Sequence, residues 1–286
     1  MTVNTITEGY GLVEGPVWHE KLGLLFSDVL FGGVYSTSDS GEVETIFSHR
    51  RGIGGMSIHV SEGLVVSGRN ISFKPFDSDT SIVLLDRDEE NGNVGYNDIT
   101  TDSKGRIYAG SLGSSPVFDD GREPQAGNLY LIDLDGTSRV VAEDIQLTNG
   151  LGFSPDNKIL YHADSRRQAV CCYDVLENGD LGPKQTFAEF DQGAPDGLVV
   201  ATDGTVWVAN ASAGRVDVFS NSGAFSHSIQ IPLPMCTSVC FGGSDLSTLY
   251  IVSGSNGVEG DRRGGVYSVS TEVSGIPVPL AKVALP

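Results

Sequence analysis

Apolar residues in this chain come in short runs of about five to eight positions, which turn-forming residues separate. One phrase recurs: a turn containing Asp, Ser or Gly is followed by a β-rich run with an aromatic or aliphatic anchor residue. The copies occupy residues 20–28, 61–68, 102–110, 155–164, 202–210 and 244–253. Their anchors, spaced 40 to 53 residues apart, are Phe26, Val66, Tyr108, Tyr161, Trp207 and Tyr250. The pattern therefore predicts an all-β chain built from six repeats.

Repeats of this length are typical of the blades of a β-propeller, in which each blade is a four-stranded antiparallel sheet. The strands expected in the fifth unit are residues 197–201, 205–209, 215–220 and 226–231. The first of these is continuously apolar and is predicted to be buried between sheets. The alternation in RVDVF, residues 215–219, predicts a half-buried outer strand. We expect a single six-bladed propeller domain over residues 1–286, since a two-layer sandwich would not explain six matched copies.

The longest interval between anchors contains a segment rich in Pro, Gly and Asp, at residues 111–128. An excursion of this composition inside a blade predicts a loop or lid over one end of the ring.

Composition narrows the possible partners. The 18 basic and 37 acidic residues give a net charge of −19, which repels nucleic acid and anionic membranes. No apolar run reaches the roughly 18 residues of a membrane span, and the first residues lack the layout of a secretory signal. The four cysteines lack the spacing of a zinc ribbon and are expected to be reduced thiols. We expect a cytoplasmic monomer or small homo-oligomer.

Polar residues occupy the start of the expected inner strand in four repeats. They are Glu14, Asn97 with Asp98, Asn149 and Asp196, whereas Ser238 and Gly55 or Met56 stand at this place in the other two. Equivalent positions of a propeller converge at one end of its channel. Carboxylate and amide oxygens without Cys or His suit a hard divalent cation, Ca²⁺ first, with Mg²⁺, Mn²⁺, Zn²⁺ or Fe²⁺ as other occupants. Taken singly, TNG and PDG are also good turn sequences.

These stretches resemble the SMP-30/gluconolactonase/luciferin-regenerating-enzyme family. The matching segments are EGPVW, YND, TNG followed by FSPD, PDGL, TSVCFGG and LSTLYIVS, in family order from residue 14 to about 270. The resemblance implies a six-bladed propeller, one divalent metal ion and hydrolysis of lactones, typically sugar lactones. It also implies that Glu14, Asn149 and Asp196 bind the metal, that Asn97 lies at the metal or substrate, and that Asp98 faces the site.

Two departures from the animal members of the family concern the expected substrate-binding residues Asn97, Gly95 and Ser114. Those members have an Arg where this chain has Gly95, and a Glu pair where it has Gly113, Ser114 and Ser115. The substrate could therefore be a less hydroxylated lactone or an ester. The basic pairs Arg166-Arg167 and Arg262-Arg263 are expected to be solvated loop charges.

The chemistry expected of such a site is hydrolysis by a lactonase or carboxylic ester hydrolase. Asp196 is the first candidate for the general base and Asp98 the second. The chain contains no Gly-x-Ser-x-Gly elbow and no His-Glu-x-x-His motif. Two alternatives stay open: an esterase or phosphotriesterase of the same fold, and a non-catalytic propeller that binds a ligand.

Overall fold

The computed structural model describes residues 2–38, 41–48, 50–78, 80–118 and 121–286. Within them the chain is all-β apart from two short 3₁₀ helices, η1 (Glu89–Asn91) and η2 (Ser165–Arg167). Neither helix of this described part is long and apolar enough to cross a membrane.

Four separate antiparallel sheets of four strands follow one another along the chain. The first two sheets comprise β2 (Val13–His19), β3 (Gly23–Asp28), β4 (Val34–Thr37) and β5 (Val43–Phe47), then β6 (Met56–His59), β7 (Gly63–Val66), β8 (Ile71–Pro75) and β9 (Ile82–Leu85). The next two comprise β10 (Gly95–Thr101), β11 (Ile107–Leu112), β12 (Gly127–Ile132) and β13 (Ser138–Ile145), then β14 (Thr148–Phe153), β15 (Ile159–Asp164), β16 (Ala169–Asp174) and β17 (Gln185–Glu189).

The remaining strands form one sheet of eight strands. Its first half comprises β18 (Ala194–Val200), β19 (Val206–Ala211), β20 (Arg215–Phe219) and β21 (Phe225–Gln230). Its second half comprises β22 (Met235–Gly242), β23 (Thr248–Gly254), β24 (Gly264–Ser270) and β1 (Asn4–Tyr10). The prediction of six separate blades is therefore wrong for the last two, because one residue pair, Ala211 with Met235, joins β19 to β22.

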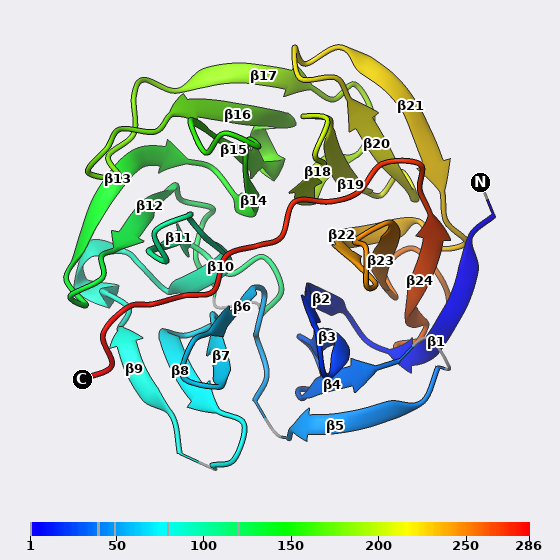
Figure 1. Cartoon of the computed structure of the whole chain (residues 1–286), viewed down its shortest axis with the longest axis horizontal. Coiled ribbons are helices and arrows are strands. Elements are labelled where there is room, and N and C mark those ends of the chain that lie inside the picture. The colour runs from blue at the N-terminus through cyan, green and yellow to red at the C-terminus, as the bar shows by residue number, and fades with distance from the viewer. Residues whose placement is uncertain (1, 39–40, 49, 79, 119–120) are drawn as a thin grey trace.

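The sheets stand around a central axis as in a propeller (Figure 1). The strands nearest the axis are β2, β6, β10, β14, β18 and β22. Each of them contacts the next one along the chain, and β22 contacts β2, so the inner strands form a closed ring. The N-terminal strand β1 completes this closure, because it pairs antiparallel with β24 at the end of the repeat array. The propeller-like all-β fold predicted from the repeats is thus confirmed.

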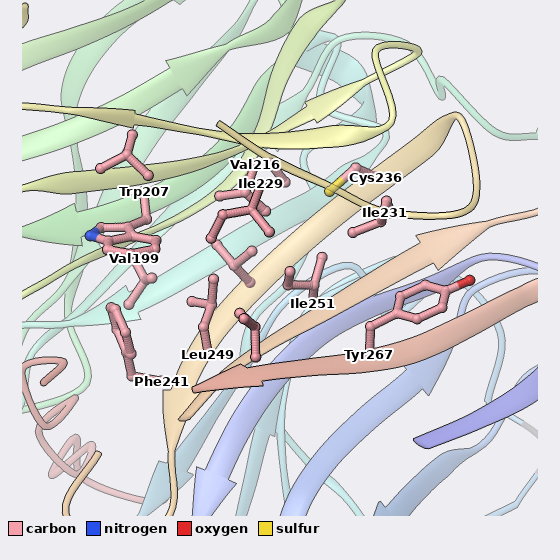
Figure 2. Close-up of a cluster of buried hydrophobic side chains, with 14 of the residues drawn as sticks. Val199, Trp207, Val216, Ile229, Ile231, Cys236, Phe241, Leu249, Ile251 and Tyr267 are labelled. Atoms are coloured by element: carbon pink, nitrogen blue, oxygen red, sulfur yellow. The ribbon is translucent and has the colours of Figure 1, made fainter. Parts of the chain in front are cut away.

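Apolar packing lies between neighbouring sheets rather than on the axis. Six buried clusters each join one group of four strands to the next, and the largest lies between the two halves of the eight-stranded sheet. Figure 2 shows this cluster, in which the rings of Trp207 and Phe241 meet edge to face with centroids 5.5 Å apart. All six anchor residues of the repeat lie on the second strand of their unit and are at most 3% exposed.

One prediction for the fifth unit is wrong. RVDVF forms β20, which is a buried third strand, and the exposed outer strand is β21. Asp217, the polar residue of the alternation, is 3% exposed and accepts hydrogen bonds from Arg215 Nε at 2.8 Å and Asn210 Nδ2 at 2.7 Å. Because these donors satisfy the carboxylate, a polar position in the pattern does not mark a solvent-facing side chain here.

The C-terminal residues 271–286 run across the ring at the end where the inner strands finish (Figure 1). Backbone hydrogen bonds tie this segment to Val200 and Thr202 after β18, to Ile58 and Val60 around β6, and to the β10–β11 turn at Gly105. Ala281 and Val283 are buried against the second and third sheets. This end of the channel is thus covered, and the starts of the inner strands lie at the other end.

Buried polar side chains hold the connections at the uncovered end. Asp28, at the end of β3, accepts hydrogen bonds from the backbone amides of Gly11, Leu12, Leu30 and Phe31 at 2.9 to 3.4 Å. Its side chain therefore fixes both the approach of the chain to β2 and the connection that follows β3.

Replacing Asp28 with Ala is expected to lower the free energy of unfolding by roughly 3 kcal/mol, because four buried or half-buried N–H groups lose their acceptor. Urea unfolding followed by tryptophan fluorescence measures this change. Asp135→Ala, which removes a similar turn interaction with Thr137 at the protein surface, is the matched control and should have a far smaller effect. Equal effects of the two substitutions would contradict the role given to Asp28.

His162 is a satisfied structural histidine, as expected from its place in a strand. Its side chain is 1% exposed and its Nε2 lies 2.8 Å from Thr148 Oγ1. Burial, with a smaller effect from Lys184, lowers the pKa of His162 to about 3. The folded protein therefore keeps this imidazole neutral at pH values where the unfolded chain would protonate it.

Between about pH 6.5 and pH 3, His162 is protonated in the unfolded chain but neutral in the folded protein. The free energy of unfolding therefore decreases as the pH falls through this window. We expect His162→Gln to flatten the decline of the unfolding free energy between pH 6.5 and pH 4 relative to the unsubstituted protein. Denaturant titrations at several pH values measure it. His227→Gln, at an exposed position, should leave the decline as it is.

Candidate metal and substrate site

The pairing of four inner strands with their neighbours is irregular near the start of each inner strand. The antiparallel register shifts between Glu14 and Val17, Tyr96 and Ile99, Thr148 and Leu151, and Pro195 and Leu198. The first shift begins at Glu14, and the other three enclose Asn97 with Asp98, Asn149 and Asp196. Bulges of this kind re-aim a side chain. The local sequence permits it: Gly15, directly after Glu14, adopts the left-handed φ of +57°.

Small residues let the inner strands approach closely at this end. A Cβ at Gly54 would lie 2.0 Å from Asn97 Oδ1, and a Cβ at Gly197 would lie 1.9 Å from Ser238 Oγ. Glycines before β6 and within β18 therefore allow the candidate residues of neighbouring strands to pack against backbone.

Three carboxyl groups from three different sheets are buried here. Glu14 is 9% exposed, Asp98 is 8% exposed and Asp196 is 5% exposed. No Lys, Arg or His among the described residues forms an ion pair with any of them. Asp196 Oδ1 is also buried without a hydrogen-bond partner in that part of the chain. Buried negative charge is thus collected at one place without a protein cation to balance it.

The three carboxyl groups affect one another's ionisation. Burial raises the pKa of Glu14 well above its usual range, and the Asp196 and Asp98 carboxyls raise it further. Burial, followed by the charge of Asp98, also raises the pKa of Asp196 well above its usual range. For Asp98, burial raises the pKa to about 7. Each group thus resists ionisation while no cation is bound beside it.

The two asparagines meet directly. Asn97 Nδ2 donates to Asn149 Oδ1 at 2.6 Å and to the carbonyl of Thr148 at 2.9 Å. Asn149 Nδ2 in turn donates to Ser165 Oγ at 2.7 Å, and Ser165 Oγ donates to the carbonyl of Pro195 at 2.6 Å. Ser165 therefore links Asn149 to the residue before Asp196.

Sequence reasoning missed Ser165. The residue lies one position beyond β15, outside the repeated phrase, and an isolated serine carries no pattern. The available signal was that second strands end in a polar residue, such as Asp28 and Asp164. Both accept hydrogen bonds from backbone amides just before an inner strand, as residues near Ser165 also could.

The two remaining candidates lie apart from the carboxyl groups in their contacts. Gly95 packs on the backbone of the second sheet, and a Cβ there would lie 2.8 Å from the carbonyl oxygen of Gly68. The position thus leaves no room for a side chain such as that of Arg. Ser114, 3% exposed, follows β11, and its Oγ lies 3.4 and 3.5 Å from the two terminal nitrogens of Arg166.

The expected excursion at 111–128 begins beside Ser114 and lies at the same end as the candidate site. Phe118 reaches the connection between β5 and β6, where the Arg51 guanidinium carbon is 5.2 Å from its ring centroid. Residues 119 and 120 of the excursion lie outside the described residues.

The donors present fit a divalent cation. Glu14 and Asp196 supply carboxylate oxygens, and the orphaned Asp196 Oδ1 and the unbalanced charge both call for a positive partner. Asn149 and Asn97 add amide oxygens of the kind that hard cations bind. Within the described residues no group of three or more His, Cys, Asp and Glu side chains has the arrangement of a metal site. The candidate set therefore depends on amide donors as well as carboxylates.

Comparisons with known proteins agree with this architecture. Regucalcin of Xenopus laevis is 30% identical over 277 residues, covering 93% of this chain and 92% of its own. The 6-deoxy-6-sulfogluconolactonase of Pseudomonas putida is 31% identical over 258 residues, covering 85% and 83% of the two chains. The crystal structure of a calcium-binding protein, regucalcin, from Agrobacterium tumefaciens superposes with a TM-score of 0.86 at 21% identity, covering 99% of this chain and 98% of that one.

The family model described as the SMP-30/Gluconolactonase/LRE-like region matches residues 12–255, which hold all the candidate residues. Together with the relatives at about 30% identity over most of both chains, this match shows that the chain belongs to the SMP-30/gluconolactonase/LRE-like family.

Proposed function

We propose that this protein is a metal-dependent hydrolase that opens lactones to hydroxy acids. The observation that carries the proposal is the buried cluster of Glu14, Asp98 and Asp196, which forms no ion pair with a Lys, Arg or His of the described residues. Membership of the family, and a relative whose name is that of a sugar lactonase, support the same reaction class.

Glu14, Asn149 and Asp196 would hold the cation, with Asn97 beside Asn149. Calcium fits an all-oxygen set best, and Zn²⁺, Mn²⁺, Mg²⁺ and Fe²⁺ are the other candidates. When bound, such an ion polarises a lactone carbonyl and stabilises the charge that develops on its oxygen.

The residues of the chain would orient the reactants and move a proton. Asp196 would take a proton from an attacking water with one carboxylate oxygen while the other stays at the cation. Asp98 is the alternative base. Ser165 keeps Asn149 turned toward Asn97, so that the amide oxygens stay at the mouth.

The surroundings of Gly95 favour a substrate with fewer hydroxyl groups than an aldonolactone, or a simple ester. The contact with Gly68 excludes a side chain that could grip sugar hydroxyls from this position. We further propose a cytoplasmic location, which the four free cysteines support.

Asp196→Asn and thorough chelation with EDTA are each expected to reduce lactone hydrolysis at least about 100-fold, because proton transfer and carbonyl polarisation are lost. A pH-drift assay on a panel of lactones and esters, with Ca²⁺, Mn²⁺, Zn²⁺, Mg²⁺ and Fe²⁺ side by side, measures this loss and identifies the ion that restores activity. Asp156→Asn, at the opposite end of the ring, is the control. Hydrolysis that continues unchanged after chelation would refute the proposal.

Glu14→Gln is expected to raise the melting temperature in EDTA, because it removes one of three buried carboxyl groups whose ionised forms are disfavoured by burial and by one another. The same substitution should shrink the rise in melting temperature that a saturating divalent cation produces, since a ligand is lost. Differential scanning calorimetry with and without the ion measures both. Asp28→Asn, where the carboxylate is satisfied by amides, should lower the melting temperature in either buffer. A Glu14→Gln protein that loses stability equally in both buffers would point to a structural role instead.

A further inference from the structure

The exposed guanidinium of Arg166 bridges the third and fourth sheets, because it contacts Ser114 of the third and Gln146 before the fourth. Arg166 lies in η2, directly after Ser165, whose hydroxyl accepts a hydrogen bond from Asn149. Its Nη1 donates to the carbonyl of Gln146, three residues before Asn149, at 3.0 Å. Both terminal nitrogens face Ser114 Oγ on the connection after β11, at 3.4 and 3.5 Å. Asn97 and Asn149 are the inner-strand residues of the same two sheets.

The neighbouring residue, Arg167, has a guanidinium that is neutralised by carboxylates. Arg167 forms ion pairs with Asp144 and, at 3.0 Å, with Asp164. Arg166 forms no ion pair with a carboxylate of the described residues, and its hydrogen bonds there go to an uncharged carbonyl and, at long range, to a hydroxyl. Carboxylates thus neutralise the charge of Arg167, whereas no carboxylate of the described residues neutralises that of Arg166.

An exposed guanidinium that is held in position but not neutralised can bind a planar anion with two parallel hydrogen bonds. The Ser114 hydroxyl, 3% exposed, adds a further polar group beside the guanidinium. The expectation that Arg166 is a solvated loop charge does not account for its contacts with Ser114 and Gln146.

The geometry points to a substrate subsite: we propose that Arg166, with Ser114, binds an anionic substituent of the lactone, remote from the carbonyl that is hydrolysed. This inference rests on the proposed function and narrows its substrate class to lactones that carry a carboxylate, sulfonate or phosphate group. Arg166 takes this role from the fourth sheet, whereas Gly95 of the third sheet has no room for a side chain.

The test compares γ-valerolactone with its analogue in which a carboxylate replaces the methyl group. The measured quantity is the ratio of kcat/KM for the anionic lactone to that for the neutral one. Arg166→Gln is expected to lower this ratio on the order of fivefold, a value that allows for solvent screening of an exposed pair. Arg166→Lys should keep part of the preference, and Arg167→Gln, the matched control, should keep the ratio of the unsubstituted protein.

Salt gives an independent readout. Raising NaCl from about 0.05 M to about 0.5 M should lower the ratio for the unsubstituted protein and leave that of Arg166→Gln unchanged, because exposed charges are screened. An equal fall of both kcat/KM values in Arg166→Gln, or the same loss of ratio in Arg167→Gln, would overturn the inference.

Binding separates this inference from the proposed function. If the protein hydrolyses no lactone of the panel with any of the ions, the proposed function fails. The subsite is then tested by calorimetric titration with pyroglutamate, a carboxylate-bearing lactam, and with its neutral methyl counterpart. Tighter binding of pyroglutamate that Arg166→Gln weakens on the order of fivefold would uphold the subsite, and equal binding of the two lactams would overturn it.

Discussion

Apolar packing between neighbouring sheets is the interaction on which this structure depends. Six buried clusters each join one group of strands to the next, so the hydrophobic core forms a ring around the axis of the propeller and does not fill the axis itself. The axis is left to the ends of the inner strands and to polar side chains. A site can therefore be placed there without breaking the apolar core, because the residues that stabilise the fold and the candidate residues for chemistry occupy different radii.

The buried carboxyl groups of the candidate site lower the stability of the folded protein. Three carboxyl groups buried together raise one another's energy when ionised, and burial alone already disfavours the charged forms of Glu14 and Asp196. Hydrogen bonds elsewhere at the same end, such as those accepted by Asp28, offset this cost locally. A fold that keeps unneutralised acids at its open end is typical of a site whose ligand supplies the missing charge.

The repeat phrase carries most of the fold, since all six anchors lie on buried second strands where the spacing places them. The register of Glu14, Asn97, Asn149 and Asp196 at the strand starts could also be predicted, because equivalent positions of a ring converge. The bridge between Ala211 and Met235 could not, because it depends on how closely two sheets approach. Nor could the burial of Asp217, which depends on donors that the alternation does not reveal, or the roles of Ser165 and Arg166, which arise from contacts between different repeats.

The pairing of β1 with β24 has a consequence for how the protein forms in the cell. The first strand leaves the ribosome long before its partner, so it must wait with unpaired backbone groups until almost the whole chain has been synthesised. Closure of the ring is then a contact of very high sequence separation, the kind that makes folding slow. In a crowded cell the waiting strand can pair with the β24 of another copy, so exchange of β1 between molecules is the misassembly to which this fold is most exposed.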